Sequence, residues 1–254
     1  MTYLRTEDGV LHIVISTAAK GTSLDFGGVN EGTAALAELD PAVGAIVIEG
    51  SGPNFCAGGD VRAFASAPSR GDYLRGLATD LHAFVRALDA APVPVVAGVQ
   101  GWAAGAGMSL VCTADIAIGG PSTMLKPAYT GIGFTPDGGM SWTLPRIVGH
   151  SRAKEIILGD TPIDANEAVR LGILSRLVAD DEIAAEVQRV AARLAAGPRS
   201  AYGGIKELLA QSRSSALSDQ LDRETEAISR SAESPTGREG VDAFVGKQKP
   251  VYPN

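Results

Sequence analysis

The 254-residue chain is poor in cysteine, histidine and aromatic residues, with two, three and 5% respectively. Cys56 and Cys112 are too few for a disulfide framework and suit a reducing compartment. The histidines, His12, His82 and His150, are scattered, so they show no metal-ligand spacing and we expect no metal site. Because aromatic side chains are scarce in a chain that is 45% hydrophobic, Ala, Val, Ile and Leu must fill the core.

Long apolar runs and an excess of basic residues are also missing. No apolar run reaches the roughly 18 residues that a membrane-spanning helix needs, so we expect no membrane partner. The formal net charge is −7, which argues against a surface for nucleic acid or anionic lipid. The N-terminus has no basic segment followed by an apolar one, so we expect no signal peptide. We therefore expect a soluble, cytoplasmic protein.

Several common ligand-binding motifs are absent. The chain has no Gly-x-Ser-x-Gly elbow, which argues against a common class of serine hydrolase. Residues 105–107 lack the third glycine of dinucleotide-binding spacing. Residues 240–248 lack both the glycine spacing and the Ser or Thr of a phosphate-binding loop. We therefore expect no nicotinamide cofactor and no nucleotide held by such a loop.

Apolar runs and helical patterns alternate along the first half of the chain. Runs of β-branched and apolar residues predict strands at residues 10–15, 45–49, 95–99 and 116–118. Apolar residues at helical spacing predict helices at residues 30–39, 70–90 and 108–113. This alternation is typical of parallel strands joined by crossover helices, and it predicts an α/β fold.

The last hundred residues are predicted to be mostly helical. Ser151 and Asp164 are candidate N-caps, and Glu167 completes a capping-box-like start after Asp164. Gly197 and Pro198 end a clear amphipathic helix. The expected helices span residues 151–158, 181–196, 200–211, 216–231 and 236–245. We therefore expect a core of residues 1–196 and a helical region of residues 197–254, which caps the core or binds another subunit.

Two glycine-dense turns, at residues 53–60 and 98–109, come directly after predicted buried strands. Glycine lets the backbone approach a ligand and direct peptide N–H groups at it. The second turn opens a helix near Ala106, and helix N-termini favour negative charge. We predict that the N–H groups of Gly59 and Ala106 hold one developing oxyanion, often the largest electrostatic contribution in acyl chemistry. The alternative is that the glycines only form tight turns.

Residues 55–60 (Phe-Cys-Ala-Gly-Gly-Asp) and 101–107 (Gly-Trp-Ala-Ala-Gly-Ala-Gly) resemble the crotonase (enoyl-CoA hydratase/isomerase) superfamily. The resemblance continues at residues 114–117, 136–139, 144–149, 165–177 and 239–252. It covers nearly the whole chain, although residues 16–28 lack the usual pattern. It implies an α/β crotonase-like spiral of repeated ββα units with a helical C-terminal region. It also implies a homo-trimer or a hexamer made of two trimers.

Members of this superfamily bind acyl-CoA thioesters and polarise the thioester carbonyl between two peptide N–H groups. The resemblance implies that Gly59 and Ala106 supply these groups. It also implies that coenzyme A enters as part of the substrate, with no separate cofactor. The flanking turn residues are expected to contact the ester: Ala57, Gly58, Asp60 and Gly105.

Other positions resemble contacts to the coenzyme and the acyl group. Arg62 matches a basic residue near the CoA phosphates. Phe244 and Lys247 match an aromatic residue and a lysine that contact the adenine end of coenzyme A. In some relatives this coenzyme A is bound by a neighbouring subunit. Alternatively, Arg62 is a solvated helix charge, and the other two belong to an ordinary C-terminal helix with a basic last turn. Tyr129 begins a segment, residues 129–142, that is expected to shape the acyl pocket.

Typical hydratases of the superfamily carry two catalytic glutamates, and the matching positions here hold Ser109 and Tyr129. Neither residue acts as a carboxylate base near neutral pH. Asp137 remains, and relatives that isomerise double bonds carry an aspartate there. The resemblance therefore implies that Asp137 shuttles a proton between two carbons of an enoyl thioester, unless it only forms a turn or an N-cap. An apolar setting for this carboxyl would come from Ile132, Phe134 and Trp142.

Aryl-CoA dehalogenases of the superfamily resemble this chain at both His82 and Asp137. In those enzymes the aspartate is the nucleophile and the histidine activates water. They use a tryptophan where this chain has Tyr129, and a histidine on a helix is usually packed or solvated. Double-bond isomerisation is therefore the favoured function. The alternatives are a hydratase with an atypical site, an aryl-CoA dehalogenase or hydrolase, and a noncatalytic acyl-CoA-binding protein.

Overall fold

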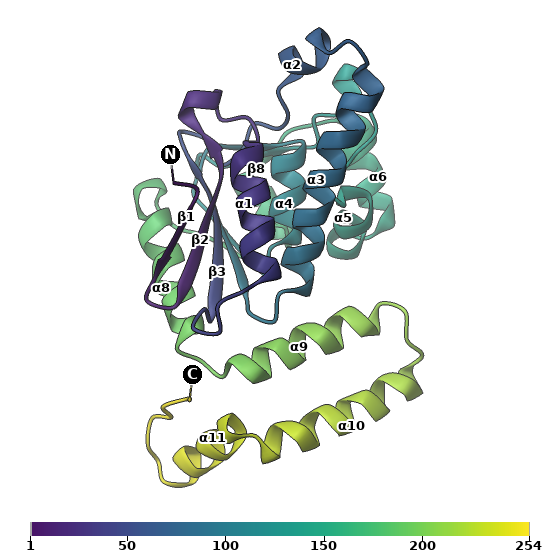
Figure 1. Cartoon of the computed structure of the whole chain (residues 1–254). Helices are drawn as coiled ribbons and strands as arrows, with labels where there is room; N and C mark the ends of the chain where they lie inside the picture. The colour runs from purple at the N-terminus through teal and green to yellow at the C-terminus, as the bar shows by residue number, and fades with distance from the viewer. Residues whose placement is uncertain (1, 254) are drawn as a thin grey trace.

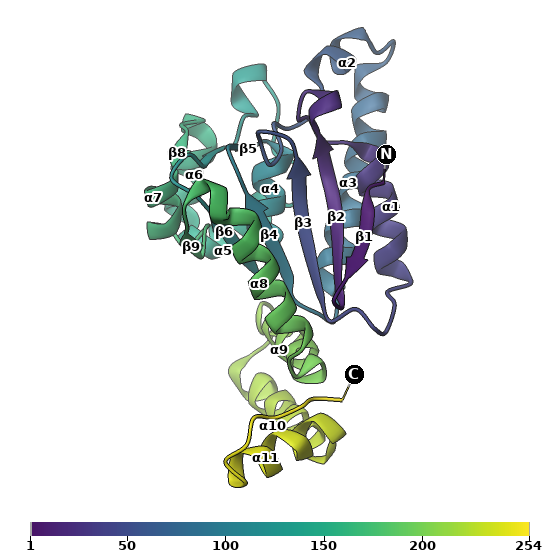
Figure 2. The same ribbon diagram turned by 90° about the vertical axis from the view of Figure 1, so that its left-hand side faces the viewer.

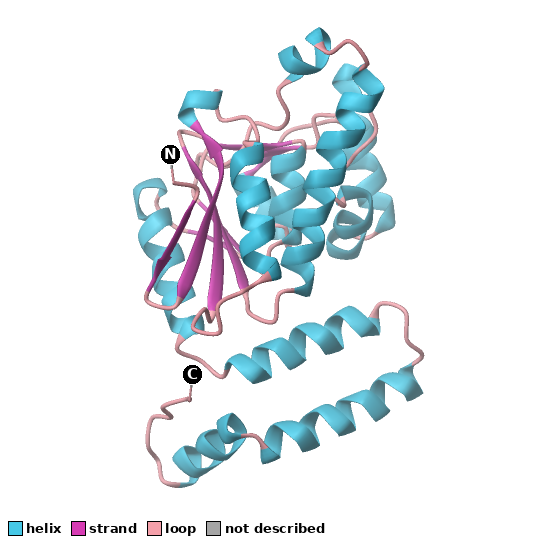
Figure 3. Cartoon of the chain, viewed as in Figure 1, coloured by secondary structure: helices cyan, strands magenta, loops and turns pink. Residues whose placement is uncertain are grey.

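The computed structural model describes residues 2–253, and its strands form two sheets (Figures 1 and 3). The larger sheet contains, in spatial order, β1 (Leu4–Glu7), β2 (Val10–Thr17), β3 (Ala45–Ser51), β4 (Val95–Val99), β6 (Ile116–Gly119) and β9 (Arg176–Leu177). Its strands run parallel except for β1, which is antiparallel to β2. The smaller sheet contains β5 (Trp102–Ala104), β7 (Met124–Lys126) and β8 (Ile163–Asp164). The predicted α/β fold is confirmed.

Helices cover both faces of the larger sheet. The helices of the first 196 residues are α1 (Phe26–Ala37), α2 (Val61–Ser66), α3 (Arg70–Ala90), α4 (Ala106–Thr113), α5 (Met140–Val148), α6 (His150–Gly159), α7 (Ala165–Arg170) and α8 (Ile183–Ala195), of which α2 lies beyond the sheet (Figure 1). Figure 2 shows α8 on one face of the sheet and α1 and α3 on the other. None of the helices within residues 2–253 is long and apolar enough to cross a membrane.

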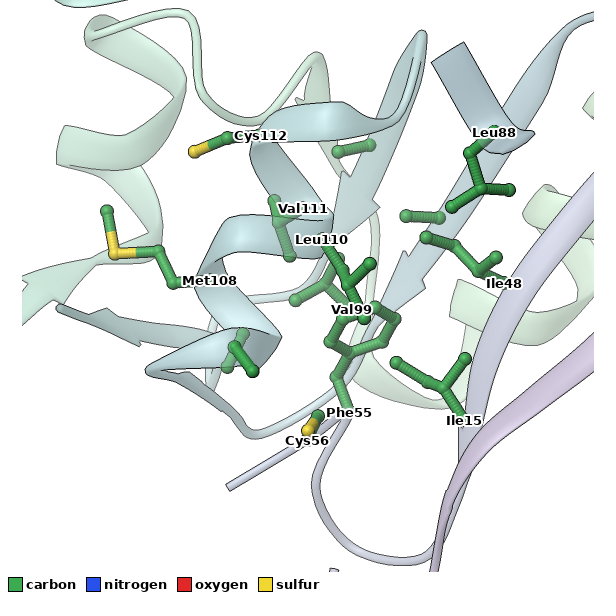
Figure 4. Packing of buried hydrophobic residues seen from close by; sticks show 14 of the residues in the cluster. Ile15, Ile48, Phe55, Cys56, Leu88, Val99, Met108, Leu110, Val111 and Cys112 are labelled. Atoms are coloured by element: carbon green, nitrogen blue, oxygen red, sulfur yellow. The ribbon is translucent and has the colours of Figure 1, made fainter. Parts of the chain in front are cut away.

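Side chains that alternate along β2 enter two separate cores, as the period of two in a strand requires. Ile13 packs with residues of α1, α3 and α4, whereas Val10 packs with residues of α8. Figure 4 shows Phe55 in the first core, close to Val99 and Leu110. Phe55 is fully buried, so it anchors the glycine turn that follows it.

Most predicted elements are present, and two have bounds that coincide with the prediction. The helix over residues 70–90 is α3, and the strand over residues 95–99 is β4. α1 begins at Phe26, earlier than predicted, because Asp25 caps it: its side chain accepts a hydrogen bond from the peptide N–H of Gly27 at 3.1 Å. The first turn of α1 contains Gly27 and Gly28, so its sequence shows little of the apolar periodicity that predicts a helix.

One predicted N-cap is wrong and the other is confirmed. Ser151 lies inside α6, whose N-cap is Gly149 with a φ of 81°. The chain already turns at this glycine, where α5 ends, so the next helix starts at once. The Asp164 side chain accepts a hydrogen bond from the Glu167 peptide N–H at 2.9 Å, as expected of the cap of α7.

Three helices form the C-terminal region below the sheets in Figure 1: α9 (Arg199–Ser212), α10 (Leu217–Glu233) and α11 (Pro235–Val245). All three were predicted. Lys206 ties α9 to the rest of the molecule by donating hydrogen bonds to Asp115 Oδ2 at 2.7 Å and to the Val93 carbonyl oxygen at 3.2 Å. Several apolar side chains of these helices are exposed: Ile205, Leu209, Leu217, Leu221, Ile228 and Phe244.

Candidate active site

The two glycine turns lie against each other. Cys56 and Ala103 form a parallel bridge, and the peptide N–H of Ala104 donates to the carbonyl oxygen of Cys56 at 2.8 Å. Gly58 and Gly105 follow, both with a positive φ, of 92° and 54°. A Cβ atom on Gly105 would lie 3.7 Å from the Cα atom of Gly58. The two turns, whose Gly58 and Gly105 are 47 positions apart in the sequence, therefore meet at one point.

Gly107 allows α4 to pack directly on the first turn. A Cβ atom at this position would lie 2.3 Å from the carbonyl oxygen of Cys56, which is far inside van der Waals contact. Burial raises the pKa of the Cys56 thiol to about 12, so this cysteine stays protonated and is a poor nucleophile. The role of Cys56 here is to join the two turns through its backbone.

The peptide nitrogens of Gly59 and Ala106 belong to residues that border one cavity of about 420 Å³. Ala106 is the first residue of α4, where a peptide N–H has no partner within its own helix. Within residues 2–253, neither N–H donates a hydrogen bond to a protein acceptor. The positive end of the α4 dipole adds to the same potential. Both N–H groups are therefore available to an oxyanion, while their role as its donors remains a prediction.

Most of the remaining cavity wall is apolar. α3 contributes Leu74, Leu77 and Leu81 at helical spacing. The ring of Phe64 packs against Gly59, and its centroid lies 6.5 Å from that of Phe134. Such a wall suits an acyl chain, and it strengthens electrostatic interactions in the cavity by excluding water.

Asp137 also lines this cavity, and its carboxylate Oδ1 accepts a hydrogen bond from the Tyr129 hydroxyl at 2.7 Å. The Ser109 hydroxyl lies 3.2 Å from that of Tyr129 and donates to the backbone oxygen of Asp137 at 3.0 Å. Burial, and then the negative charge of Asp137, raise the pKa of Tyr129, so its hydroxyl stays protonated. The two positions without glutamate thus meet at the one predicted carboxylate.

The apolar neighbours predicted for Asp137 are correct in part. Ile132 and Phe134 line the cavity with it. Trp142 does not, and this prediction is wrong. It lies on α5, where the guanidinium groups of Arg146 and Arg213 sit 4.0 and 4.4 Å from the centre of its ring. The positive φ of Gly138 and Gly139 turns the chain into α5 immediately after Asp137.

His82 lies on α3 beside the turn that carries Asp137. Its Nε2 accepts a hydrogen bond from the peptide N–H of Gly138 at 3.1 Å, so Nε2 is unprotonated in this arrangement. The imidazole is not among the groups that line the cavity. The structure therefore brings His82 to the backbone next to Asp137, while its activation of water remains a prediction.

The flanking residues of the first turn have different surroundings. Ala57 and Gly58 line the cavity. Asp60 instead caps α2, because its Oδ1 accepts hydrogen bonds from the peptide N–H groups of Arg62 at 3.0 Å and Ala63 at 3.1 Å. Arg62 is exposed on α2 and is not part of the cavity wall.

Phe244 and Lys247 are not brought to this cavity. Phe244 is 85% exposed on α11, and Lys247 follows that helix. Figure 1 shows α11 at the opposite end of the molecule from α2, which lies beside the cavity. A contact to coenzyme A bound by another subunit remains a prediction for both residues.

The cavity wall also contains an ion pair that the sequence did not predict. Lys126 Nζ lies 3.4 Å from Asp160 Oδ2, and Asp160 Oδ1 accepts a hydrogen bond from the Ala128 peptide N–H at 2.6 Å. Lys126 ends a three-residue strand and Asp160 follows α6, so no short motif links them. Within residues 2–253, no group of three or more His, Cys, Asp and Glu side chains is placed to hold a metal ion.

Comparison with known proteins gives concordant matches. The model of the family described as enoyl-CoA hydratase/isomerase matches residues 5–254. A Rhodobacter capsulatus protein named probable enoyl-CoA hydratase is 36% identical, over 88% of this chain and 86% of its own length. The 1,2-epoxyphenylacetyl-CoA isomerase of Escherichia coli is 32% identical, over 85% of this chain and 83% of its own.

Two further matches extend the comparison. The 4-chlorobenzoyl coenzyme A dehalogenase-1 of an Arthrobacter species is 30% identical, over 83% of this chain and 77% of its own. The crystal structure of an enoyl-CoA hydratase from Polaromonas sp. JS666 superposes with a TM-score of 0.90 at 31% identity, covering 98% of each chain. The relatives thus share one fold and include proteins named for three different reactions.

Proposed function

The chain belongs to the enoyl-CoA hydratase/isomerase (crotonase) family, and we propose that it is a member that moves a double bond in an enoyl-CoA thioester, with Asp137 as both acid and base. The family assigns it as an enzyme acting on acyl-CoA. Its specific reaction depends on which groups surround the reacting carbons.

In the proposed reaction, the thioester oxygen of a 3-enoyl-CoA accepts hydrogen bonds from the N–H groups of Gly59 and Ala106. The Asp137 carboxylate removes a proton from C2, and the electrons of that C–H bond form a dienolate whose charge rests on the thioester oxygen. The protonated Asp137, whose proton can exchange with solvent, then delivers a proton to C4, so the C3–C4 double bond becomes a C2–C3 double bond. The step needs no water and no redox partner, and Asp137 ends as it began.

The observation that carries this proposal is which oxygens of the two carboxylates in the cavity wall already have a hydrogen-bond or ion-pair partner. Both oxygens of Asp160 are engaged, one by Ala128 and one by Lys126. Asp137 uses only Oδ1, so among the described residues its Oδ2 has no hydrogen-bond donor. Ser109 and Tyr129 replace the glutamate pair that adds water in typical hydratases. A single available carboxylate supports proton transfer within the substrate.

The relative from Escherichia coli is named as an isomerase of an epoxide-bearing acyl-CoA, so it supports isomerisation of an acyl-CoA in general. The match to a dehalogenase keeps one alternative, in which Asp137 attacks an aryl-CoA and His82 activates water. The contact of His82 Nε2 with the Gly138 N–H must open for that role. Chloride release from 4-chlorobenzoyl-CoA and hydration of crotonyl-CoA distinguish these reactions from isomerisation.

The test of the proposal is the variant Asp137→Asn, assayed with trans-3-hexenoyl-CoA and 4-phenyl-3-butenoyl-CoA. General acid–base catalysis contributes roughly 10²- to 10⁴-fold, so we expect kcat to fall by about that factor while the CoA ester still binds. The matched control is Asp181→Asn, an exposed aspartate in the short 3-10 turn that precedes α8. Full isomerase turnover by Asp137→Asn would contradict the proposal.

We propose in addition that the chain assembles as a homo-trimer or hexamer in the cytoplasm through its C-terminal region, residues 197–254. Leu217, Ile228 and Phe244 are each more than 70% exposed there, an uncommon arrangement unless another surface covers them. In such an assembly, Phe244 and Lys247 would reach the coenzyme bound by another subunit, and Arg62 would lie near the phosphates of its own.

A further inference from the structure

Three side chains meet where the family usually places two glutamates. Tyr129 donates to Asp137 Oδ1 at 2.7 Å, and the Ser109 hydroxyl is within 3.2 Å of the Tyr129 hydroxyl. Tyr129 is 7% exposed and Ser109 is fully buried, so water competes little for these bonds. A buried hydrogen bond to a carboxylate is stronger than one between neutral groups.

The same cluster is tied to the oxyanion turn. The Ser109 hydroxyl lies 3.3 Å from the carbonyl oxygen of Gly105 and donates to the backbone oxygen of Asp137 at 3.0 Å. Ser109 stands on α4, one turn after Ala106, whose N–H is a proposed oxyanion donor. One short helix therefore holds both a donor for the thioester oxygen and the anchor of the acid–base residue.

The backbone beside Asp137 is held on its other side as well. A Cβ atom on Gly138 would lie 2.8 Å from the Cβ atom of Ser109, so the turn packs closely on α4. The peptide N–H of Gly138 donates to His82 Nε2 at 3.1 Å. With its backbone held on both sides, Asp137 moves mainly by rotation about its side-chain bonds.

We propose that Ser109 and Tyr129 are positioning residues: Tyr129 holds Oδ1 of Asp137, and Ser109 holds the backbone oxygen of Asp137 against α4, so that Oδ2 alone carries the substrate proton. This inference rests on the proposed function of Asp137 and adds to it a role for the two residues that stand at the glutamate positions. Tyr129 then acts through Asp137, in addition to forming part of the cavity wall.

The structure gives a reason why this arrangement speeds the reaction. A carboxylate free to rotate presents either oxygen at many angles, whereas proton transfer needs one oxygen within hydrogen-bonding reach of both C2 and C4. The Tyr129 hydroxyl remains protonated and cannot accept the substrate proton itself, so it serves as a fixed donor. Removing this donor should affect turnover far more than binding.

The first experiment measures kcat and KM of Tyr129→Phe for trans-3-hexenoyl-CoA, with deuterium incorporation from D₂O at C2 and C4 as a second readout. We expect kcat and the incorporation rate to fall on the order of tenfold to a hundredfold, with KM changed less than about threefold. The matched control is Tyr202→Phe, which packs in the second core beside α8 and far from the cavity lining. It should leave kcat unchanged.

The second experiment uses Ser109→Ala and the double variant Ser109→Ala with Tyr129→Phe. The test therefore does not depend on a single variant that could fail to fold. We expect Ser109→Ala to lower kcat severalfold, and the double variant to lose less than the product of the two single losses, because both residues position the same carboxylate. The positioning role would be overturned if Tyr129→Phe kept its kcat, if only KM changed, or if the kcat losses of the two single variants multiplied in the double variant. Asp137→Asn would still be inactive in each of these cases. An active Asp137→Asn would instead overturn the proposed function.

Discussion

At the scale of single residues, the separation between the two glycine turns depends on Gly107. Its Cα atom faces the carbonyl oxygen of Cys56, and no side chain fits between them. Gly58 and Gly105 hold positive φ angles in the same turns. The positions of the two proposed oxyanion donors therefore depend on glycines that bear no functional group.

Gly107→Ala is predicted to separate the turns. The added methyl group must displace the Cys56 backbone, since it would otherwise sit 2.3 Å from that carbonyl oxygen. We expect a loss of about 1–3 kcal/mol in the free energy of unfolding, as for other overpacked sites. Because a shift of about 1 Å in catalytic groups costs on the order of a hundredfold, kcat should fall at least tenfold.

The control for this substitution is Gly76→Ala on α3, where the added methyl group meets no atom within 4 Å. It should leave kcat unchanged and raise the free energy of unfolding by up to about 1 kcal/mol, because alanine favours the helix. Denaturant unfolding and steady-state kinetics measure both variants. Equal behaviour of Gly107→Ala and Gly76→Ala would refute the requirement for glycine at position 107.

At the scale of elements, α9 is the link between the sheet and the C-terminal helices. The Lys206 ammonium is mostly buried, and it bonds Asp115, which also accepts from the Val95 peptide N–H at 2.8 Å. Arg199 at the start of the same helix donates to the Pro41 carbonyl oxygen at 2.8 Å. These bonds fasten α9 at two points along its length.

Lys206→Met is predicted to weaken the attachment of α9 to the rest of the molecule, because methionine keeps the apolar part of the lysine side chain but has no ammonium group. The loss of a partly buried pair and of the bond to the Val93 carbonyl should cost roughly 2 kcal/mol of unfolding free energy. Hydrogen exchange should accelerate in α9 before it does in the sheet. Lys154→Met, at an exposed position of α6, is the control and should change neither quantity. Unaltered exchange in α9 of Lys206→Met would show that its docking does not depend on this pair.

At the scale of the whole molecule, apolar side chains on the C-terminal helices decide the expected assembly. Leu217 is 74% exposed and Ile228 is 71% exposed on α10. Mass measurement of the native protein should give three or six times the 26.1 kDa of one chain. The double variant Leu217→Glu and Ile228→Glu should shift this mass toward one chain, because burying two unpaired carboxylates is costly. A monomeric native protein would contradict the assembly.

The parts of the fold that the sequence predicts are those with local periodicity. α3 carries Leu74, Leu81 and Leu88 on one face, and Pro92 and Pro94 separate it from β4, so both elements could be placed closely. β5, β7, β8 and β9 are two or three residues long, too short to show a period of two. They form only because distant segments pair with them.

The site divides in the same way. The glycine turns indicated where two free peptide N–H groups meet, because conformational freedom and helix N-termini are local properties. Asp137 was found through a resemblance, not through its contacts. The bonds from Tyr129 and Ser109 to Asp137 join residues 8 and 28 positions apart, and the Lys126–Asp160 pair joins residues 34 positions apart. No periodic pattern encodes such side-chain contacts.

The most direct test of the account is a crystal structure of Asp137→Asn with trans-3-hexenoyl-CoA bound. The account predicts the thioester oxygen within about 2.7–3.1 Å of the peptide nitrogens of both Gly59 and Ala106, with residue 137 next to C2 and C4. A thioester oxygen turned away from either nitrogen, or a residue 137 remote from both carbons, would contradict it.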